Sequence, residues 1–468
     1  MNPSMKSGLF DANERVLVIG LGRSGRASIE VLGSRVAAIF ATDENPAFDP
    51  RSIGVPFVAP ADLGGVLPSV TAAVLSPGIP LNGDLVRRVQ SAGVPVFSEV
   101  EVAYRICQAP IVAVTGTKGK TTTTALIGAI FKAAGKTTHV GGNIGNALIH
   151  ETAIAGPDDW VIAEVSSFQL ESIRSFKPRI SLITNISPDH LDRYFSMDEY
   201  AEAKFRIVAN QGPSDTFVGN LDDERIAALG VGDDAVRVKA RARWFALEPH
   251  RTTALYLRNN ETIVYAPPTG DPRPIEIMRV ADIPMRGKHN VENVLGAILV
   301  SLCAGLDRAA IAQAVRDFQP LHHRLEPAGE HAGVHYIDDS KATNPGSVIA
   351  ALRSFDRPIV LIAGGKAKGT DFAELGKVIS SRTKAIVLMG EAADDIAKTV
   401  KRAKIARAAS MEEAVGIAAA LASAGDIVLL SPGCASFDMF LSAEDRGEKF
   451  SAAVAKLANG GSGVTHAR

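Results

Sequence analysis

The amino-acid sequence predicts an α/β protein of three domains, and two observations lead to that expectation. The chain has 468 residues, which at ~150 residues per domain suggests about three domains. Three segments also begin alike, with a short β-branched run, a glycine-rich turn and a helix-like stretch, which is typical of parallel sheets. We place the boundaries near residues 107 and 320, which predicts domains over 1–107, 108–320 and 321–468.

Composition narrows the class of protein. The 50 Lys and Arg residues nearly balance the 51 Asp and Glu residues, so the net charge of −1 gives no support for a nucleic-acid partner. An apolar fraction of 46% with 22% charged residues excludes a wholly disordered, collagen-like or coiled-coil chain. Aromatic residues make up only 6%, which argues against a platform for stacking bases.

Cysteine usage and hydropathy indicate a soluble, cytoplasmic protein. Cys107, Cys303 and Cys434 are far apart and form no CxxC pair, so neither a disulfide framework nor a cysteine zinc site is expected. No apolar stretch reaches the ~18 residues that a membrane span needs, and the polar N-terminus does not resemble an export signal.

The first segment is expected to hold a small parallel sheet. Its opening run Val-Leu-Val-Ile-Gly is apolar and β-branched, which is typical of a buried strand. Strands are predicted over 16–20, 36–41, 72–75 and 94–97, with helices over 27–32 and 99–108.

The second and third segments repeat this pattern. In the second, strands are predicted over 111–115, 160–165 and 180–186, helices over 121–134, 198–210 and 290–302, and an antiparallel region over 216–274. In the third, strands are predicted over 334–337, 359–362, 385–389 and 426–430, followed by a frayed Gly/Ser-rich tail over 459–468.

The strongest motif is Thr115-Gly-Thr-Lys-Gly-Lys-Thr121, which follows a predicted strand and opens a helix. Its glycines let backbone N–H groups approach phosphate oxygens, Lys120 can reach the β- and γ-phosphates, and the Thr121 hydroxyl can bind Mg²⁺. The spacing departs from the full phosphate-loop pattern because Val114 stands where that pattern begins with glycine. The alternative is a tight strand–helix turn with a surface lysine.

A second glycine-rich turn, Gly20-Leu-Gly-Arg-Ser-Gly25, follows the first strand, and Asp43 follows the next. This spacing is typical of dinucleotide-binding folds, in which the acidic residue contacts a ribose. It predicts a site for a nucleotide or its pyrophosphate. NAD binding is a narrower alternative, and a turn that uses glycine only for close packing is another.

Two further clusters follow strands of the second segment. Glu164 ends one strand, and His190 lies just beyond the next, so both could share a hard cation with Thr121. The alternative for His190 is an ordinary capping or loop histidine. Periodicity alone predicts that Lys204, in the middle of a helix, is solvated.

The third segment carries polar clusters over 322–326, 338–344, 364–369 and 431–436. All but the first follow predicted strands. Lysine and hydroxyl groups on several loops at one sheet edge suit an anionic substrate, whereas the alternative is a set of solvated turns.

Together these motifs resemble the Mur ligase family, the ATP-dependent amino-acid-adding enzymes of peptidoglycan precursor synthesis. The resemblance is carried by Thr-Gly-Thr-x-Gly-Lys-Thr at 115–121, Gly-Gly-Asn-Ile-Gly at 141–145, Glu-x-Ser-Ser-Phe-Gln-Leu at 164–170, Asp-His-Leu-Asp-Arg-Tyr at 189–194, Gly-x-His-Asn at 287–290, His-Arg-x-Glu at 323–326 and Asp-Ser-Lys-Ala-Thr-Asn at 339–344. The last motif is similar to that of the members that add D-glutamate.

The resemblance implies a Rossmann-like N-terminal domain that binds a UDP-sugar, a central P-loop ATPase domain, and a Rossmann-like C-terminal domain that binds the amino acid. It implies a cytoplasmic, monomeric enzyme in which ATP phosphorylates the carboxylate of UDP-N-acetylmuramoyl-L-alanine. The amine of D-glutamate then attacks the acyl phosphate.

The resemblance also implies roles for individual residues. Lys120, His190 and Lys204 are expected to be catalytic, and Lys204 is expected to be carbamylated. Thr121 and Glu164 are expected to hold one Mg²⁺ and His190 a second, with the carbamylated Lys204 as a further Mg²⁺ ligand. ATP contacts are expected at Gly116, Thr117, Lys118, Gly119, Lys120, Thr121, Thr122, Asn293, Arg324, Asp339 and Lys341. UDP-sugar contacts are expected at Ser24, Asp43, Ser76 and Asn143, and D-glutamate contacts at Thr343, Lys368 and Ser436.

The sequence departs from the family at Glu44-Asn45, where Thr-Arg is frequent, and at Ala443, where some relatives have phenylalanine near the glutamate. Three other functions remain open at this point. They are an NAD-dependent oxidoreductase, a non-enzymatic nucleotide switch and a ligase that lengthens folate polyglutamate chains.

Overall fold

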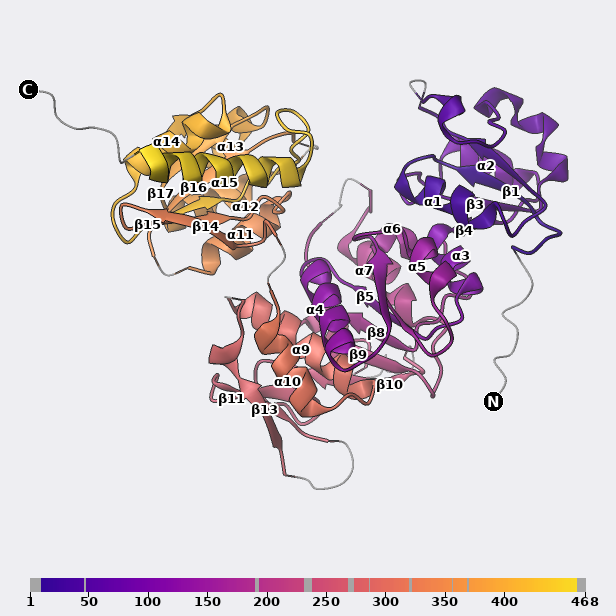
Figure 1. The fold of residues 1–468 in the computed structure, drawn as a ribbon, viewed down its shortest axis with the longest axis horizontal. Coiled ribbons are helices and arrows are strands. Elements are labelled where there is room, and N and C mark those ends of the chain that lie inside the picture. Colours follow the sequence, from indigo (N-terminus) through magenta and orange to yellow (C-terminus); the bar gives the residue numbers. More distant parts are fainter. Residues whose placement is uncertain are drawn as a thin grey trace, which may run out of the picture. The chain divides into compact units, whose positions relative to one another are not determined.

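The computed structural model describes residues 10–45, 48–189, 193–230, 238–267, 273–285, 287–319, 322–355, 357–367 and 370–460. The chain divides into two compact units, the first comprising Met1–Pro284 and Asn290–Phe318, and the second Met285–His289 and Gln319–Arg468. Figure 1 shows the helices and strands along the chain. The predicted α/β class is confirmed, because the described part contains three sheets in which most neighbouring strands run parallel. Each sheet lies within one of the three predicted ranges, and the exact domain boundaries remain a prediction.

The first unit begins with a parallel four-stranded sheet in the order β2-β1-β3-β4. Val16 and Val18 face one core, while Leu17 and Ile19 face another, so helices cover both faces as in other parallel sheets. The elements are β1 (Arg15–Ile19), α1 (Arg23–Leu32), β2 (Ala38–Thr42), β3 (Ala72–Leu75), α2 (Asp84–Ser91), β4 (Val96–Ser98) and α3 (Glu99–Ile106).

The same unit holds a nine-stranded sheet in the order β13-β12-β11-β10-β9-β8-β5-β7-β6. Its strands are β5 (Ile111–Thr115), β6 (Thr138–Gly142), β7 (Trp160–Glu164), β8 (Ile180–Ile183), β9 (Thr216–Asn220), β10 (Arg241–Phe245), β11 (Thr253–Arg258), β12 (Thr262–Tyr265) and β13 (Ile275–Arg279). Its helices are α4 (Lys120–Ala133), α5 (Leu148–Ile154), α6 (Ser167–Leu170), α7 (Met197–Phe205), α8 (Glu224–Ala227), α9 (Lys288–Cys303) and α10 (Arg308–Asp317).

The antiparallel region predicted over 216–274 is only partly right. Strands β11, β12 and β13 pair antiparallel, but β9 and β10 run parallel to β8 and extend the central sheet. Every residue of β9 is buried, as expected for a strand covered on both faces. The prediction failed at β9 because the short alternating runs lie after residue 250, whereas β9 is buried throughout and pairs parallel with both of its neighbours.

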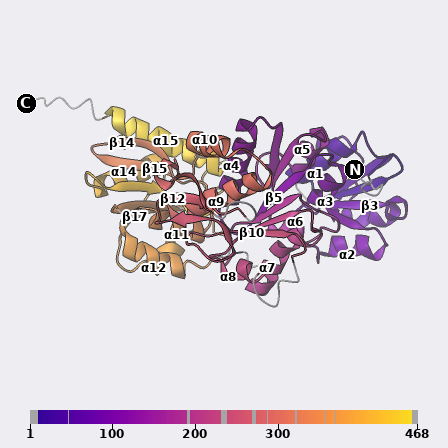
Figure 2. The same cartoon turned by 90° about the horizontal axis from the view of Figure 1, so that it is seen from below.

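The second unit contains a six-stranded sheet in the order β14-β15-β19-β16-β17-β18, parallel except at β14. Alternate residues of β16 face two cores, and Figure 2 shows α15 and α12 on opposite sides of the strands. The elements are β14 (Glu326–His331), β15 (Val334–Asp338), α11 (Pro345–Arg353), β16 (Ile359–Gly364), α12 (Ala373–Arg382), β17 (Thr383–Met389), α13 (Ala393–Thr399), β18 (Lys404–Arg407), α14 (Met411–Leu421), β19 (Ile427–Leu430) and α15 (Ala443–Gly460).

Two predictions about the chain as a whole meet the structure only in part. Among the described residues, no helix combines the length and apolarity that crossing a bilayer requires. The tail predicted to fray over 459–468 lies almost wholly outside the described residues, since α15 ends at Gly460.

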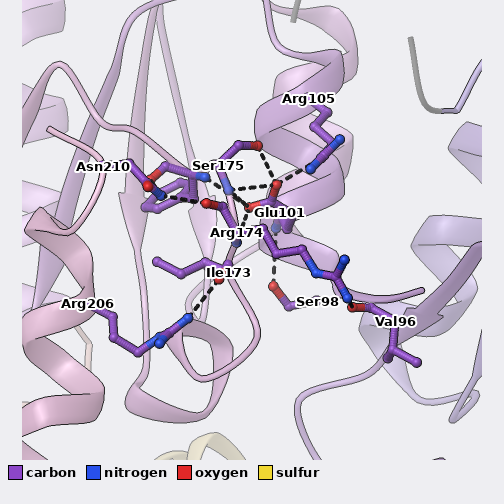
Figure 3. A network of polar contacts seen from close by, with 10 residues as sticks. Val96, Ser98, Glu101, Arg105, Ile173, Arg174, Ser175, Arg206 and Asn210 are labelled. Carbon is purple, nitrogen blue, oxygen red and sulfur yellow. Dashed lines mark hydrogen bonds and ion pairs between the residues drawn. The ribbon is translucent and has the colours of Figure 1, made fainter. Parts of the chain in front are cut away.

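A buried carboxylate on α3 ties the region of the small sheet to that of the large one (Figure 3). The fully buried Glu101 accepts backbone hydrogen bonds from Arg174, Ser175 and Phe176 at 2.9–3.0 Å, and one from Arg105 Nε at 2.8 Å. Burial alone would raise the pKa of Glu101, but these bonds and one from the Ser175 hydroxyl outweigh it and hold the pKa below its usual value.

We expect Glu101→Ala to lower the free energy of unfolding of the first unit by roughly 3–5 kcal/mol, because it leaves buried donors and Arg105 without an acceptor. Urea denaturation followed by tryptophan fluorescence would measure this, since both tryptophans, Trp160 and Trp244, lie in that unit. The contribution of ionised Glu101 to the free energy of unfolding is complete above the pKa of an ordinary glutamate. It is lost as the pH falls through the lowered pKa of Glu101 in the folded state.

Arg87→Ala is the matched control, because Arg87 pairs with Asp84 on the surface and should contribute nothing measurable. Equal destabilisation by both variants would contradict the role given to Glu101.

Candidate active site

The loop between β5 and α4 is held so tightly that only glycine fits at two positions. At Gly116, with φ +143°, an added Cβ would lie 2.0 Å from Thr184 Oγ1. At Gly119, with φ +79°, it would lie 2.0 Å from Asn293 Oδ1. The predicted glycine-rich loop is therefore present, and its backbone packs directly against the end of β8 and the start of α9.

Two lysines converge on this loop. Lys120 Nζ donates to Gly116 O and to Thr117 O, both at 2.9 Å, and Lys204 Nζ, from α7, donates to Gly116 O at 2.8 Å. Lys204 is only 1% exposed, so the expectation from periodicity that it is solvated is wrong. Burial, followed by the positive charge of Lys120, holds the pKa of Lys204 well below its usual value. The Lys204 amine therefore has a reduced tendency to carry a proton.

Glu164 ends β7 beside this loop, paired in register with Val114 of β5. It is 1% exposed, and Asn143 Nδ2 donates to its Oε1 at 2.8 Å. Its Oε2 is buried and has no hydrogen-bond partner among the described residues. A buried carboxylate oxygen without a hydrogen-bond donor is suited to bind a cation. Left without any partner, such an oxygen would cost about 1–3 kcal/mol in lost hydration, and more when it is charged.

The residues that brace the loop escaped the sequence analysis. Thr117 N donates to Asn185 O at 2.8 Å, Lys118 N donates to Asn185 Oδ1 at 2.9 Å, and Thr184 Oγ1 donates to Lys118 O at 2.7 Å. The Tyr200 hydroxyl lies 3.2 Å from Thr117 Oγ1, and its ring lies 4.5 Å from Lys204 Nζ. The available signal was a pair of polar residues directly after the apolar run of β8.

The structure places some predicted metal ligands but not all. Thr121 and Thr122 are the second and third residues of α4 and are half-buried. His190 and Lys368 lie outside the described residues, so their predicted roles are not placed. Glu164 lies close enough to Lys204 for its charge to oppose the lowering of the Lys204 pKa.

The glycine-rich turn after β1 is also built as a close approach. An added Cβ at Gly25 would lie 2.0 Å from Gly20 O, and the Ser76 hydroxyl donates to the same oxygen at 2.6 Å. Asp43 accepts from Leu21 N at 2.6 Å and from Asn45 N at 2.8 Å, so it shapes the turn. Ser24 is the second residue of α1. These predicted UDP-sugar residues therefore gather around one turn.

In the second unit, two of the predicted ATP residues, Asp339 and Lys341, lie on the loop after β15, whereas Arg324 precedes β14. Asp339 is buried and accepts from the Ser431 hydroxyl at 2.7 Å. Burial raises the pKa of Asp339 to about 7, although the Ser431 hydrogen bond and the positive charge of Arg324 oppose that rise. Lys341, in the same loop, pairs with Glu444.

Two of the predicted D-glutamate residues, Thr343 and Ser436, lie on loops that meet at a buried arginine, which the sequence analysis did not single out. Arg446 donates to Ser340 Oγ at 2.9 Å, Ser340 O at 2.8 Å and Cys434 O at 3.2 Å. It thereby joins the loop that carries Thr343, which is exposed, to the loop that carries Ser436, which is buried. Burial lowers the pKa of Arg446 to about 10.

Comparison with protein families identifies two regions of the chain. Residues 114–301 match the Mur ligase middle domain, and residues 323–434 match the glutamate ligase domain of Mur ligases. The two matched regions contain the phosphate loop, Glu164 and Lys204, and the loops of Asp339 and Thr343.

Full-length relatives agree. A UDP-N-acetylmuramoylalanine–D-glutamate ligase of Pelotomaculum thermopropionicum is 42% identical over 96% of this chain and 98% of its own. One of Koribacter versatilis is 39% identical over 95% and 98%.

Solved structures show the same fold at lower identity. The UDP-N-acetylmuramate-alanine ligase of Thermotoga maritima has a TM-score of 0.59 at 20% identity and covers 95% of this chain and 100% of its own. The MurF ligase of T. maritima in complex with ADP also has a TM-score of 0.59, at 16% identity, and covers 96% of each chain. With relatives this similar along nearly its whole length, the chain belongs to the Mur ligase family.

Proposed function

We propose that this chain is an ATP-dependent ligase that joins D-glutamate to UDP-N-acetylmuramoyl-L-alanine during peptidoglycan precursor synthesis. The observation that carries the proposal is the convergence of Lys120, Lys204 and Glu164 at one edge of the nine-stranded sheet. The names of its full-length relatives support this substrate pair.

The reaction follows from two transfers. The L-alanyl carboxylate attacks the γ-phosphorus of ATP and displaces ADP, which forms an acyl phosphate. The D-glutamate amine then attacks the acyl carbon, loses a proton and displaces phosphate, which leaves the amide. Charge on the transferring phosphoryl group must be neutralised, and we assign this role to Lys120, whose Nζ contacts the backbone of the phosphate loop.

Magnesium fits the residues present. Thr121 and Glu164 would hold one Mg²⁺, His190 would hold a second, and the modified Lys204 would be a further ligand. Glu164 Oε2, which has no hydrogen-bond partner among the described residues, is the observation that supports this set. When bound, Mg²⁺ supplies neutralising charge for the phosphate oxygens. Glu164 itself is held in orientation by Asn143.

Carbamylation of Lys204 would make a lysine chemically sensible among metal ligands. A neutral amine adds to the carbon of CO₂ and releases a proton, which leaves an N-carboxylate with a negative charge. The low pKa of Lys204 favours the neutral amine that this reaction needs.

The remaining roles are proposed from the family resemblance. The backbone and side chains of Gly116, Thr117, Lys118, Gly119 and Thr122, together with Asn293, Arg324, Asp339 and Lys341, would contact ATP. Thr343, Lys368 and Ser436 would hold the two carboxylates of D-glutamate, and Ser24, Asp43, Ser76 and Asn143 would contact the UDP-sugar. We propose that the enzyme acts in the cytoplasm and that it is a monomer. Sedimentation velocity would test the oligomeric state.

An amino-acid panel in an ADP-release assay tests the proposed function directly. We expect ADP release only when UDP-N-acetylmuramoyl-L-alanine and D-glutamate are both present, with the amide product found by mass spectrometry. Turnover with L-glutamate, L-lysine or D-alanyl-D-alanine instead would refute the substrate assignment. Nucleotide binding without amide formation would favour a switch.

Lys120→Ala should lower kcat by roughly 10²–10³-fold, because it removes a cation placed for the developing phosphate charge. The fold should persist, since Lys120 Nζ contacts backbone carbonyls of its own loop. Lys132→Ala, at an exposed position of the same helix, is the control and should leave kcat unchanged. Steady-state kinetics and circular dichroism would separate the two results.

Lys204→Ala should also lower kcat by roughly 10²–10³-fold, and short carboxylic acids should restore part of it by replacing the missing carboxylate. The same acids should not rescue Lys120→Ala, whose missing group is a cation. A folded Lys204→Ala enzyme that no carboxylate rescues would argue against the carbamate.

A further inference from the structure

Arg23 extends from one glycine-rich site toward another. It is the first residue of α1 and lies within the Gly20–Gly25 turn. Although its side chain is largely exposed, Nη1 donates to Gly145 O at 2.8 Å, and Nη2 donates to Gly142 O at 3.2 Å and to Asn143 O at 3.4 Å. One planar guanidinium thus holds three carbonyls of the loop after β6, within the same compact unit.

That loop is in turn fastened to the end of β7. Asn143 N donates to Glu164 O at 2.9 Å, and Gly142 N donates to Asn146 O at 2.8 Å. At Gly142, with φ +110°, an added Cβ would lie 2.3 Å from Glu164 O. The loop therefore has little freedom to move without moving the backbone of Glu164.

The Asn143 side chain completes the connection. Its Nδ2 donates to Glu164 Oε1 at 2.8 Å, which leaves Oε2 as the oxygen without a partner among the described residues. Because Asn143 decides which oxygen is occupied, the orientation of the Glu164 carboxylate depends on where the loop is held.

We propose that Arg23 is a positioning residue for the metal site. It restrains the 142–145 loop so that Asn143 holds Glu164 in the orientation that receives the cation. Arg23 also lies in the turn proposed to bind the UDP-sugar, so that turn and the metal ligand are joined by one chain of hydrogen bonds. This inference rests on the proposed function, in that it takes Glu164 to be a metal ligand.

Mn²⁺ binding to the full-length enzyme in the presence of a non-hydrolysable ATP analogue tests the proposal, with free Mn²⁺ read by electron paramagnetic resonance. Loss of a residue that holds a metal ligand in its orientation typically weakens metal binding by about 10–100-fold, so Asn143→Ala should fall in that range and Arg23→Met near its lower end. Arg23→Lys should resemble Arg23→Met, because a single ammonium cannot reproduce the planar fork.

The double variant Arg23→Met/Asn143→Ala should bind Mn²⁺ no more weakly than Asn143→Ala alone, because Arg23 acts through Asn143. Hydrogen exchange at the amides of Gly142 and Asn143 should accelerate in Arg23→Met without metal or nucleotide. Arg88→Met is the matched control, since among the described residues the Arg88 side chain donates to Pro60 O, within the region of the small sheet, and the variant should change neither readout.

Additive losses in the double variant would overturn the proposal, as would unchanged exchange at the loop. If Arg23→Met loses affinity for UDP yet keeps normal Mn²⁺ binding, Arg23 is a direct phosphate ligand and the proposal fails. Glu164→Gln separates this failure from that of the proposed function. If Glu164→Gln leaves Mn²⁺ binding intact, the assignment of Glu164 as a metal ligand is wrong. If Glu164→Gln weakens Mn²⁺ binding while Arg23→Met binds Mn²⁺ normally, only the role given to Arg23 is refuted.

Discussion

The carbonyl oxygen of Gly116 is the point on which the central site depends. It accepts hydrogen bonds from both Lys120 Nζ and Lys204 Nζ. Two ammonium groups on one oxygen repel each other, and burial together with the charge of Lys120 lowers the pKa of Lys204. Glycine at 116 allows this arrangement, since any side chain would collide with Thr184. The conformation of the loop therefore also determines the surroundings that lower the pKa of Lys204.

Much of this site could be predicted from the sequence because parallel strands deliver their ends to one edge of a sheet. The phosphate loop is local, so its strand, glycines and helix are all visible within a few residues. Glu164 is the last residue of an apolar strand, and a carboxylate in that place points to the ligand-binding edge. Lys204 is different, because its burial depends on how α7 packs against a loop distant in sequence.

The elements missed in the sequence are polar strands and tertiary contacts. Strands β14 and β18 lie at the two edges of their sheet, and neither has a long apolar run. Strand β14 also includes Pro327 and Gly329, which are unusual inside a strand. Arg446 escaped notice because arginine is ordinarily exposed, and only the folded chain surrounds it with carbonyls. The position of Asn185 directly after the apolar run of β8 was a sequence signal, but its hydrogen bonds to the loop could be identified only in the folded chain.

Three buried glutamates of the first unit differ in how their carboxylate oxygens are satisfied. Glu101 accepts donors on both oxygens, so its charge is fully compensated and holds two regions together. Glu99 also has a buried oxygen without a partner among the described residues, but burial raises its pKa to about 7, and protonation can relieve that oxygen. Glu164 has the same deficit at the edge of the sheet, beside two lysines and the start of a helix. A cation would relieve such a deficit best, which is why the hydrogen-bond status of Glu164, more than its burial, supports the proposal that it is a metal ligand.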